Sequence, residues 1–507
     1  MTEILQKDTF RPYIETFNRQ DTFEGNAGIR NRDAWDYLAD RMPLFDCPDR
    51  EMLLTYYFRW WVFRKHIHDV PGGRVITEFL PDVSWAGKYN TIVMAAPFHL
   101  EEARWLRNET LCREYLSFWY GGESKLFDYS NSLPRAALDV GAVTGNREDF
   151  LPFYEKMNAE HAGWENGFDW DFGNWDPERY FGVHRIGLRE NGLFYTCDDL
   201  EGSEYSASGH GYRPLLNSCM YASRSALSEM ARLLGCTEES ETYRTQAEAL
   251  RKTILSELWN PDVRFFTVRH TDGSMSDARE LYGYTPWMFG IPDASMEDAW
   301  LALRENGGFL APAAAPFLVT SHPDFVLRYD SHSCRWDGPS WPLGTSFLLK
   351  SLISLLHTPG SHPVDRTDFF FYLSQYARSQ RIVADNGELL PWIDENQNPF
   401  TGEWIARTIL GGSAQVIPRG KDYNHSCFAD LIITGLCGLI PSYSGEIRVD
   451  PLLPDGVWDY FCLDRVLYHG KELTILWDRT GNVYRRGTGF RVFADGECIL
   501  ARPTLHE

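Results

Sequence analysis

The sequence predicts a mainly α-helical protein with a small antiparallel β domain at its C-terminal end. Helical periodicity recurs along most of the chain, as in the apolar positions of 243–258, which follow one another in steps of three or four. From about residue 440 the pattern changes to short β-branched and aromatic runs separated by Asp-Gly, His-Gly and Thr-Gly turns. Of the 507 residues, 43% are hydrophobic and 15% aromatic, enough to bury a large core.

These patterns divide the chain into three parts. Apolar stripes of helical spacing and no internal repeat or low-complexity linker predict one helical domain over 31–440. The runs EIRVDP, YFCLD, ELTILWD and FRVFADG predict strands in a C-terminal β domain over 441–507, packed against the helices. Residues 1–30 show no clear period and are interpreted as an N-terminal extension. The stripes lie at 51–67, 91–106, 222–234, 347–355 and 367–378.

The charge and the apolar pattern exclude several classes of function. Lys and Arg number 49 against 71 Asp and Glu, which gives a net charge of −22 without a basic cluster, so no nucleic-acid partner is expected. No apolar run approaches the roughly 18 residues of a membrane span, and the first twenty residues are polar without a signal-peptide pattern. We therefore expect a cytoplasmic protein with no membrane association.

Metal and cofactor chemistry also lack support in the sequence. The 10 cysteines form no CxxC pair, which indicates reduced thiols. His66 and His68 are two apart, a spacing that puts them on different sides of a helix. No GxGxxG, GxxxxGK[ST] or GxSxG motif occurs, so the sequence predicts no metal site and no cofactor. Of the chemistries considered, catalysis by carboxylates is the one that remains.

Tryptophans outside the apolar stripes are unusually frequent. One interpretation is that they fill gaps between helices, as aromatic residues do in most cores. The other is sugar binding, because an aromatic face contacts the C–H face of a sugar while neighbouring polar side chains bond its hydroxyls. Their clustering favours the second. The residues concerned are Trp164, Trp170, Trp175, Trp336, Trp341, Trp392 and Trp404.

An acidic loop at 197–218 places Asp198, Asp199, Glu201 and Glu204 beside glycines and serines. A carboxyl that is desolvated near like charges has a raised pKa, as a general acid working near neutral pH requires. A solvated acidic turn with Asp caps explains the pattern equally well.

A second polar loop at 391–404 carries Asp394, Glu395 and Glu403. A carboxylate here could position a water, and a paired acid and base are the working parts of glycoside hydrolysis. Alternatively, Asp394 or Glu403 pairs with Arg407.

Several segments, in order along the chain, resemble known glycosidases. CRWDGPSWPLGTS is similar to the W-x-GP-x-W segment of glycoside hydrolase family 63 and the related mannosylglycerate hydrolase-like enzymes, which extend to family 142 and are six-hairpin glycosidases. GSEYS at 202–206 resembles the family 63 segment that carries the general acid, and WIDENQNPFTG resembles the segment that carries the general base. Further segments at 76–91, 279–290 and 422–436, and the C-terminal tail, extend the resemblance over most of 76–480.

The resemblance implies an (α/α)6 barrel followed by the β domain, with loops from one end of the barrel forming the pocket. It implies an inverting mechanism, with Glu204 as general acid and Glu395 as general base. Two departures predict a changed sugar pocket: Glu204 stands where family 63 has Asp, and Asp337 where it usually has Arg.

Other residues of these loops are candidates for substrate binding. Trp336, Asp337 and Trp341 are expected to line the sugar subsite, and Trp392 to flank the base. Arg213 is either a substrate contact or a buried arginine that ties helices together by ion pairs. The other polar candidates either contact the substrate at the rim of the pocket or make ordinary hydrogen bonds at helix ends. The remaining candidates are Trp85, Lys88, Asn90, Tyr212, Asn217 and His425.

The predicted function is cleavage of a terminal sugar from a small oligosaccharide or glycoconjugate by an inverting glycoside hydrolase. Glucosides, mannosides and arabinofuranosides all occur among the enzymes it resembles, so the glycone stays open. An inverting phosphorylase, a helical-barrel isomerase or lyase, and a sugar-binding protein without catalysis are the alternatives. A barrel of this kind is compatible with a monomer or a homo-oligomer.

Overall fold

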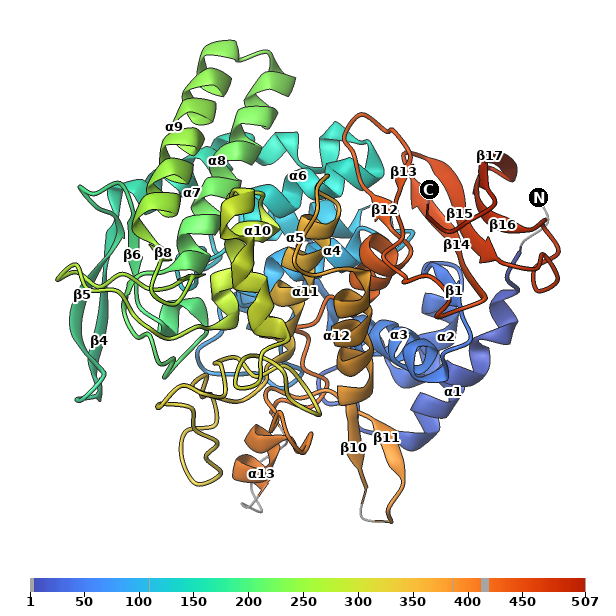
Figure 1. Ribbon diagram of the computed structural model, residues 1–507, viewed down its shortest axis with the longest axis horizontal. Helices are drawn as coiled ribbons and strands as arrows, with labels where there is room; N and C mark the ends of the chain where they lie inside the picture. Colours follow the sequence, from blue (N-terminus) through green and yellow to red (C-terminus); the bar gives the residue numbers. More distant parts are fainter. Residues whose placement is uncertain (1–3, 109, 385, 412–418, 507) are drawn as a thin grey trace.

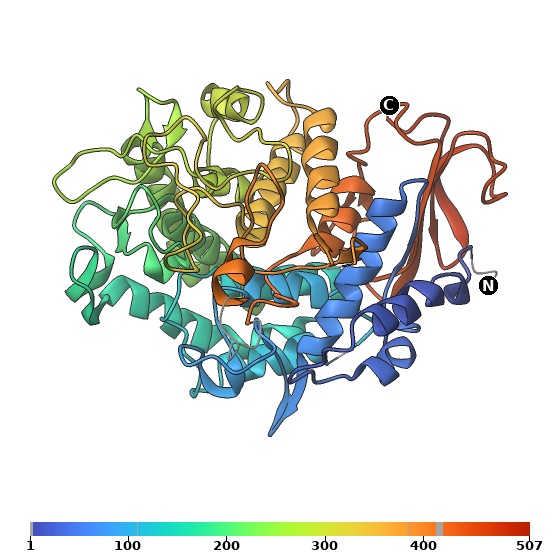
Figure 2. The ribbon, with the colours of Figure 1, turned by 90° about the horizontal axis from the view of Figure 1, so that it is seen from below.

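The computed structural model describes residues 4–108, 110–384, 386–411 and 419–506 (Figure 1). Helices surround the centre of the molecule, and a sheet formed mainly by the C-terminal residues stands at one end (Figures 1 and 2). The start of the described chain lies against that sheet, because the amides of Ile4 and Leu5 donate to Asp464 Oδ2 at 3.2 and 2.9 Å. In the described ranges, no helix combines the length and the apolar character that crossing a membrane requires.

The predicted helices are present, and the protein is mainly helical. Helix α8 ends at Gly235, whose φ of 81° is the left-handed conformation that closes many helices. The α-helices are α1 (Arg11–Gln20), α2 (Ala34–Leu38), α3 (Arg50–Phe63), α4 (Ala96–Ala103), α5 (Leu111–Trp119), α6 (Leu133–Thr144), α7 (Tyr154–Asn166), α8 (Pro214–Leu234), α9 (Thr237–Glu257), α10 (Thr285–Met288), α11 (Pro342–Leu356), α12 (Arg366–Ser379), α13 (Ile405–Gly411) and α14 (Phe428–Asp430), which continues as a π-helix over Leu431–Leu436.

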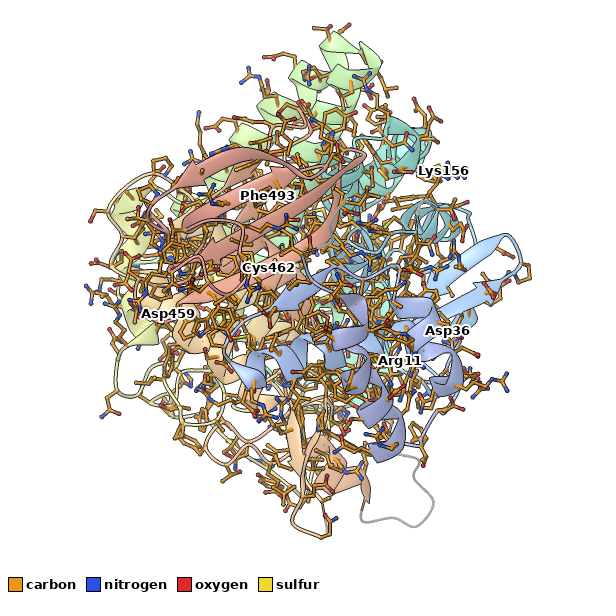
Figure 3. All side chains as sticks on the ribbon, turned by 90° about the vertical axis from the view of Figure 1, so that its right-hand side faces the viewer. Arg11, Asp36, Lys156, Asp459, Cys462 and Phe493 are labelled. Carbon is orange, nitrogen blue, oxygen red and sulfur yellow. The ribbon has the colours of Figure 1, made fainter. Side chains whose placement is uncertain are left out.

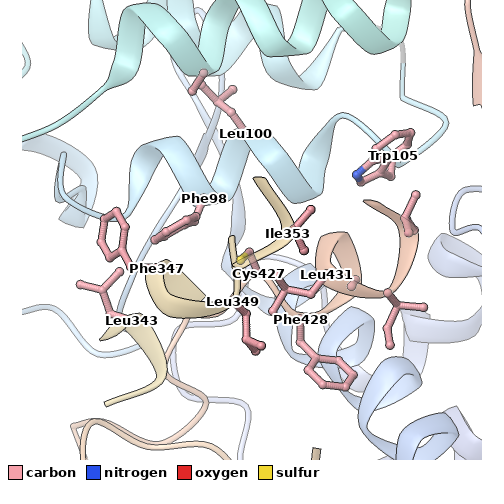
Figure 4. Close-up of a cluster of buried hydrophobic side chains, with 14 of the residues drawn as sticks. Phe98, Leu100, Trp105, Leu343, Phe347, Leu349, Ile353, Cys427, Phe428 and Leu431 are labelled. Atoms are coloured by element: carbon pink, nitrogen blue, oxygen red, sulfur yellow. The ribbon is translucent and has the colours of Figure 1, made fainter. Parts of the chain in front are cut away.

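The core beneath the loops joins helices that are far apart in sequence. Figure 4 shows Phe98 of α4 beside Phe347 of α11, and their ring centroids are 4.8 Å apart. A buried ionic contact accompanies this apolar packing: Asp430 of α14 accepts from Arg104 and from Lys350 of α11, each at 2.8 Å. Because these charges are paired within the core, they fix the relative positions of α4, α11 and α14.

The C-terminal strands form one antiparallel sheet, as predicted, but its first strand comes from the helical region. The strand order is β1-β14-β15-β16-β17. Strand β1 is too short for periodicity to reveal it, and Phe45 in its middle exchanges hydrogen bonds with the hydroxyl of Tyr57 on α3. Figure 3 shows the sheet, marked by Cys462 and Phe493, beside the helices that carry Arg11 and Asp36. The strands are β1 (Leu44–Asp46), β14 (Tyr460–Tyr468), β15 (Lys471–Asp478), β16 (Gly489–Ala494) and β17 (Glu497–Arg502).

The N-terminal segment, interpreted from the sequence as an extension without period, contains α1. Phe10, Ile14 and Phe17 are buried at steps of four and three, and Phe10 stacks on Tyr57 with ring centroids 4.9 Å apart. These positions follow helical spacing, so the signal was present in the sequence but confined to one short helix.

A four-stranded antiparallel sheet lies where the sequence indicated only a loop between helices. Strands β4 (Phe168–Asp176), β5 (Tyr180–Leu188), β6 (Phe194–Thr196) and β7 (Gly211–Tyr212) pair in that order. Phe168, Trp170 and Phe172 alternate with acidic residues, which is a strand pattern that the Gly and Asp content obscured. Short two-stranded ribbons complete the fold: β2 (Ile67–Val70) with β3 (Gly73–Ile76), β8 (Trp259–Asn260) with β9 (Phe265–Phe266), β10 (Arg381–Val383) with β11 (Leu389–Pro391), and β12 (Leu439–Ile440) with β13 (Arg448–Val449).

Candidate functional site

One cavity of about 520 Å³ brings together the two carboxylates singled out by the sequence. Glu204, from the loop before α8, and Glu395, from the loop after β11, both line it. Three further acids, Glu78, Asp128 and Asp199, share the wall. A volume of this size suits a small ligand such as one or two sugar rings.

The chain around Glu204 has an unusual backbone that is held from several sides. Gly202 and Tyr205 both adopt left-handed conformations, with φ of 54° and 60°. The Tyr205 amide donates to the Tyr180 hydroxyl at 2.7 Å, and the Glu204 carbonyl accepts from the Trp336 amide at 3.1 Å. A left-handed non-glycine residue costs free energy, so the surrounding contacts must enforce this turn.

Arg213 makes several of the contacts that hold the loop around Glu204 in place. Its guanidinium is buried, pairs with Glu201, and donates to the hydroxyls of Ser203 and Ser206 at 3.1 and 3.2 Å. Of the two interpretations made from the sequence, the structure therefore places Arg213 in an ion-pair network, outside the cavity lining. It contacts the loop on both sides of Glu204 and so positions that residue.

The electrostatics around Glu204 favour its protonated form. Burial and the neighbouring charges of Asp199, Asp198 and Glu395 hold the pKa of Glu204 well above its ordinary value. Asp199 itself is raised to a pKa of about 7, mainly by burial and by Asp198. A carboxyl that keeps its proton near neutral pH can act as a general acid.

Glu395 lies in a different environment, clamped by a cation. Arg419 donates from Nε to Oε1 and from Nη2 to Oε2, both at 2.7 Å, and the Cys334 thiol donates to Oε2 at 3.2 Å. Only 1% of Glu395 is exposed. A buried carboxylate with a bidentate arginine partner is stabilised in its charged form, as a general base requires. Asp394 and Glu403, the other acids of this loop, line a separate cavity of about 990 Å³ that contains neither Glu204 nor Glu395.

Aromatic side chains form much of the remaining wall. Trp336 and Trp341 stack in parallel, with ring centroids 4.1 Å apart, and Trp85 is 39% exposed at the opening. Trp170 and Trp175 reach the same cavity from strand β4. Trp164 instead lies buried in α7, and Trp404 donates its indole N–H to the Arg381 carbonyl at 2.8 Å, so these two have structural roles.

Three polar candidates from the sequence lie outside the cavity because other groups hold them. Lys88 points to the surface, where it pairs with Glu123. The Asn90 side chain bonds the backbone of 79–83, and Asn217 bonds the Phe194 amide and carbonyl at 2.8 and 2.9 Å. Both asparagines therefore order loops.

The other candidates divide between the cavity and its surroundings. His425 lines the cavity. Asp337 does not, because its carboxylate pairs with Arg335. The backbone of Tyr212 pairs with that of Arg269, and the cations of Arg407 and Lys421 lie 4.4 and 4.7 Å from the ring centroid of Trp392.

Several residues of the site were not among the candidates proposed from the sequence, and Glu78, Arg419 and Tyr423 are three of them. Glu78 follows β3, Arg419 precedes the DYNHS segment, and Tyr423 lies within that segment. The segments containing Glu78 and Tyr423 carried the family resemblance, and that is the signal that could have identified them. Arg419 has no such signal, because only the fold brings it to Glu395.

One group of side chains in the described residues has metal-ligand chemistry, and it lies outside the cavity. His184, Cys197 and His210 place ligand atoms within 4.8 Å of one another. Protein groups already occupy His210, whose Nε2 bonds the Arg179 carbonyl at 3.0 Å and whose Nδ1 lies 3.0 Å from Asp198 Oδ1. Burial raises the pKa of Cys197, which keeps its thiol protonated.

Comparison with known proteins relates two parts of the chain to glycoside hydrolase domains. Residues 183–426 match the mannosylglycerate hydrolase MGH1-like glycoside hydrolase domain, and residues 441–499 match the C-terminal domain of glycosyl hydrolase family 65. A solved sialidase structure is 34% identical with a TM-score of 0.89, over 99% of this chain and 44% of that one. The chain thus spans less than half the length of that protein.

Two more distant structures share the fold alone. An α-L-rhamnosidase from Streptomyces avermitilis, complexed with L-rhamnose, is 12% identical with a TM-score of 0.54, over 90% of this chain and 38% of that one. The family GH78 rhamnosidase of Bacillus sp. GL1 is 13% identical with a TM-score of 0.53, over 86% of this chain and 40% of that one.

Glu204 and Glu395 both lie within the part of the chain that matches a glycoside hydrolase domain. Through residues 183–426 the chain is similar to the mannosylglycerate hydrolase MGH1-like glycoside hydrolases.

Proposed function

We propose that the protein is an inverting glycosidase that removes a terminal sugar from a small oligosaccharide or glycoconjugate. Glu204 is the general acid and Glu395 the general base. The observation that carries this proposal is that both residues line one cavity of sugar size while their surroundings differ: like charges around Glu204, an arginine on Glu395. Environments that favour opposite protonation states mark an acid and base pair.

In the proposed reaction, protonated Glu204 donates to the glycosidic oxygen as the bond to the anomeric carbon breaks. Glu395 accepts a proton from a water that attacks the opposite face of the sugar, so the product has the inverted anomeric configuration. The stacked pair Trp336 and Trp341 supplies an apolar surface for the ring. We further propose that the helices form an (α/α)6 barrel whose loops at one end make this cavity.

The charges of the cavity disfavour a phosphorylase. That reaction replaces the attacking water by a phosphate, which needs unpaired cations and no base carboxylate. In the described lining, the cations are Arg419, paired with Glu395, and Lys125, which lies 3.1 Å from Asp128. The described wall therefore offers an incoming phosphate no unpaired cation.

A panel of aryl glycosides of neutral pentoses, hexoses and deoxyhexoses tests the proposal. We expect hydrolysis of at least one, with no sugar 1-phosphate when phosphate is added. Glu204→Gln and Glu395→Gln should each reduce kcat by about 10² to 10⁴, the usual contribution of one proton transfer. Full activity in both variants, or a phosphate-dependent product, would overturn it. Sugar binding without hydrolysis of any glycoside would instead favour a binding protein.

A further inference from the structure

Three polar atoms in the described part of the cavity wall have no hydrogen-bond partner: the indole nitrogen of Trp336, and one atom each of Glu78 and His425. Glu78 and His425 are 4% and 3% exposed, and both line the cavity. In the described part of the chain, Glu78 Oε2 and His425 Nε2 have no hydrogen-bond partner. Other atoms of the two residues have partners. His425 Nδ1 bonds the Tyr423 hydroxyl and lies 3.3 Å from Glu78 Oε1. The backbone carbonyl of Glu78 accepts from the Asn424 amide at 3.0 Å.

A buried polar atom without a partner costs free energy, so native proteins rarely retain one away from water or ligand. At a cavity wall, such an atom is a ready binding group. Burial raises the pKa of Glu78 to about 8 and lowers the pKa of His425 well below its ordinary value, which leaves both uncharged near neutral pH. A neutral hydroxyl group matches both atoms, because it donates and accepts hydrogen bonds alike.

The charges of the cavity discriminate further among sugars. Its cations, in the described lining, are Arg419 and Lys125, and both are paired with carboxylates of the same wall. A sugar that carries a carboxylate would have to displace one of these pairs and approach Glu78, Asp199 and Glu204. A buried anion without a cation partner is strongly disfavoured, so the wall rejects acidic sugars.

We propose that Glu78 and His425 form the subsite that holds hydroxyls of the glycone, and that this subsite selects neutral sugars over sugars that carry a carboxylate. The inference rests on the proposed function in assigning the cavity to a sugar, and it adds the substrate class and two binding residues.

Calorimetric titration of the full chain with free monosaccharides tests the selectivity. The neutral probes are L-arabinose, L-rhamnose, D-mannose, D-glucose and D-galactose. The acidic probes are D-glucuronate, D-galacturonate and N-acetylneuraminate, of which the first two differ from their neutral counterparts only at C6. We expect a neutral sugar to bind and the uronates and N-acetylneuraminate to bind at least about tenfold more weakly than it. Equal or tighter binding of an acidic sugar, or binding by none of the neutral ones, would overturn the proposal.

Variants of the two residues test the subsite itself. Glu78→Leu and His425→Phe should each weaken binding of the neutral sugar about tenfold, whereas Glu78→Gln, which keeps a donor and an acceptor, should weaken it much less. A monodeoxy analogue that lacks the contacted hydroxyl should bind the wild type and the matching variant equally. Lys88→Ala, at the surface outside the cavity, is the control and should bind as the wild type does. Thermal unfolding identifies any variant that fails to fold. In that case the test is made with Glu78→Gln, by comparing its affinity for the sugar with its affinity for the deoxy analogue.

The two proposals fail in different ways. If Glu204→Gln is inactive but Glu78→Leu and His425→Phe bind the sugar as the wild type does, the subsite is wrong and the hydrolase stands. If binding follows the subsite but Glu204→Gln remains fully active, the assignment of catalysis is wrong and the neutral subsite stands.

Discussion

Arg419 holds both oxygens of Glu395 by two parallel hydrogen bonds of 2.7 Å. Because Glu395 is buried, its charge depends on this partner. The two residues are 24 positions apart and come from separate loops, so the contact also joins those loops beside the cavity.

Replacing the arginine should therefore damage both stability and activity. Arg419→Met leaves a buried carboxylate without a cation. We therefore expect the unfolding free energy to fall by about 3 to 5 kcal/mol and most of the turnover to be lost. Arg419→Lys keeps the charge but loses the bidentate geometry, so its effects should be intermediate. Chemical denaturation and kcat/KM measured on both variants check this order; a stable, active Arg419→Met would show that the pair is dispensable.

The pH dependence of activity should report the proton on Glu204. Its pKa is raised, so kcat/KM should fall on the alkaline side as Glu204 loses its proton. Asp199→Asn removes a nearby negative charge, which makes ionisation of Glu204 easier and lowers its pKa. The alkaline limb of the profile should then move to lower pH. An alkaline limb that stays in place, or moves to higher pH, would contradict this electrostatic account.

The same carboxyl should make the protein less stable as the pH rises. Between its unfolded pKa near 4.5 and its raised folded pKa, the folded state binds more protons than the unfolded state. Stability is therefore lost with increasing pH, by at most about 1.4 kcal/mol per pH unit for this group. Glu204→Gln cannot ionise, so its melting temperature should exceed that of the wild type at pH 7 to 8, and the difference should vanish toward pH 4.

Glu395→Gln provides the contrast to that variant. It removes the charge that Arg419 needs, so it should lower the melting temperature at neutral pH although the substitution is equally conservative. Equal melting temperatures for Glu204→Gln and Glu395→Gln would mean that the two carboxyls do not lie in the opposite environments described here.

Removal of Arg213 should disorder the acid loop. Arg213→Met leaves buried Glu201 unpaired, and we expect a loss of about 3 to 5 kcal/mol in unfolding free energy together with reduced kcat. Arg185→Met, which breaks the exposed pair with Asp169, is the control and should cost less than about 1 kcal/mol. Adding Glu201→Gln to Arg213→Met should recover part of the stability; recovery of full activity as well would exclude a positioning role for Arg213.

The sequence predicted what depends on local pattern or on extended resemblance. The long helices, the C-terminal strands, and the segments that carry Glu204, Glu395, Trp336 and Trp341 all have such signals. Strand β4 also had one, since its apolar residues alternate with acidic ones, but its Gly and Asp residues suggested a loop.

Partner choice is the part that a sequence does not reveal. Asn90 and Asp337 have the right chemistry for a sugar site, yet one bonds the backbone beside it and the other pairs with Arg335 two residues away. Arg419 lacked any motif, and only the folded chain brings it to Glu395. Short-range hydrogen bonds thus removed expected residues from the site, and long-range packing added unexpected ones.

The anomeric configuration of the first product tests the central claim most directly. Proton NMR, recorded within the first turnovers on a glycoside that the protein hydrolyses, should show the anomer opposite to that of the substrate, because Glu395 activates a water on the face opposite Glu204. Initial release of the same anomer would contradict the account, since it would require a covalent glycosyl intermediate on one of the two carboxylates.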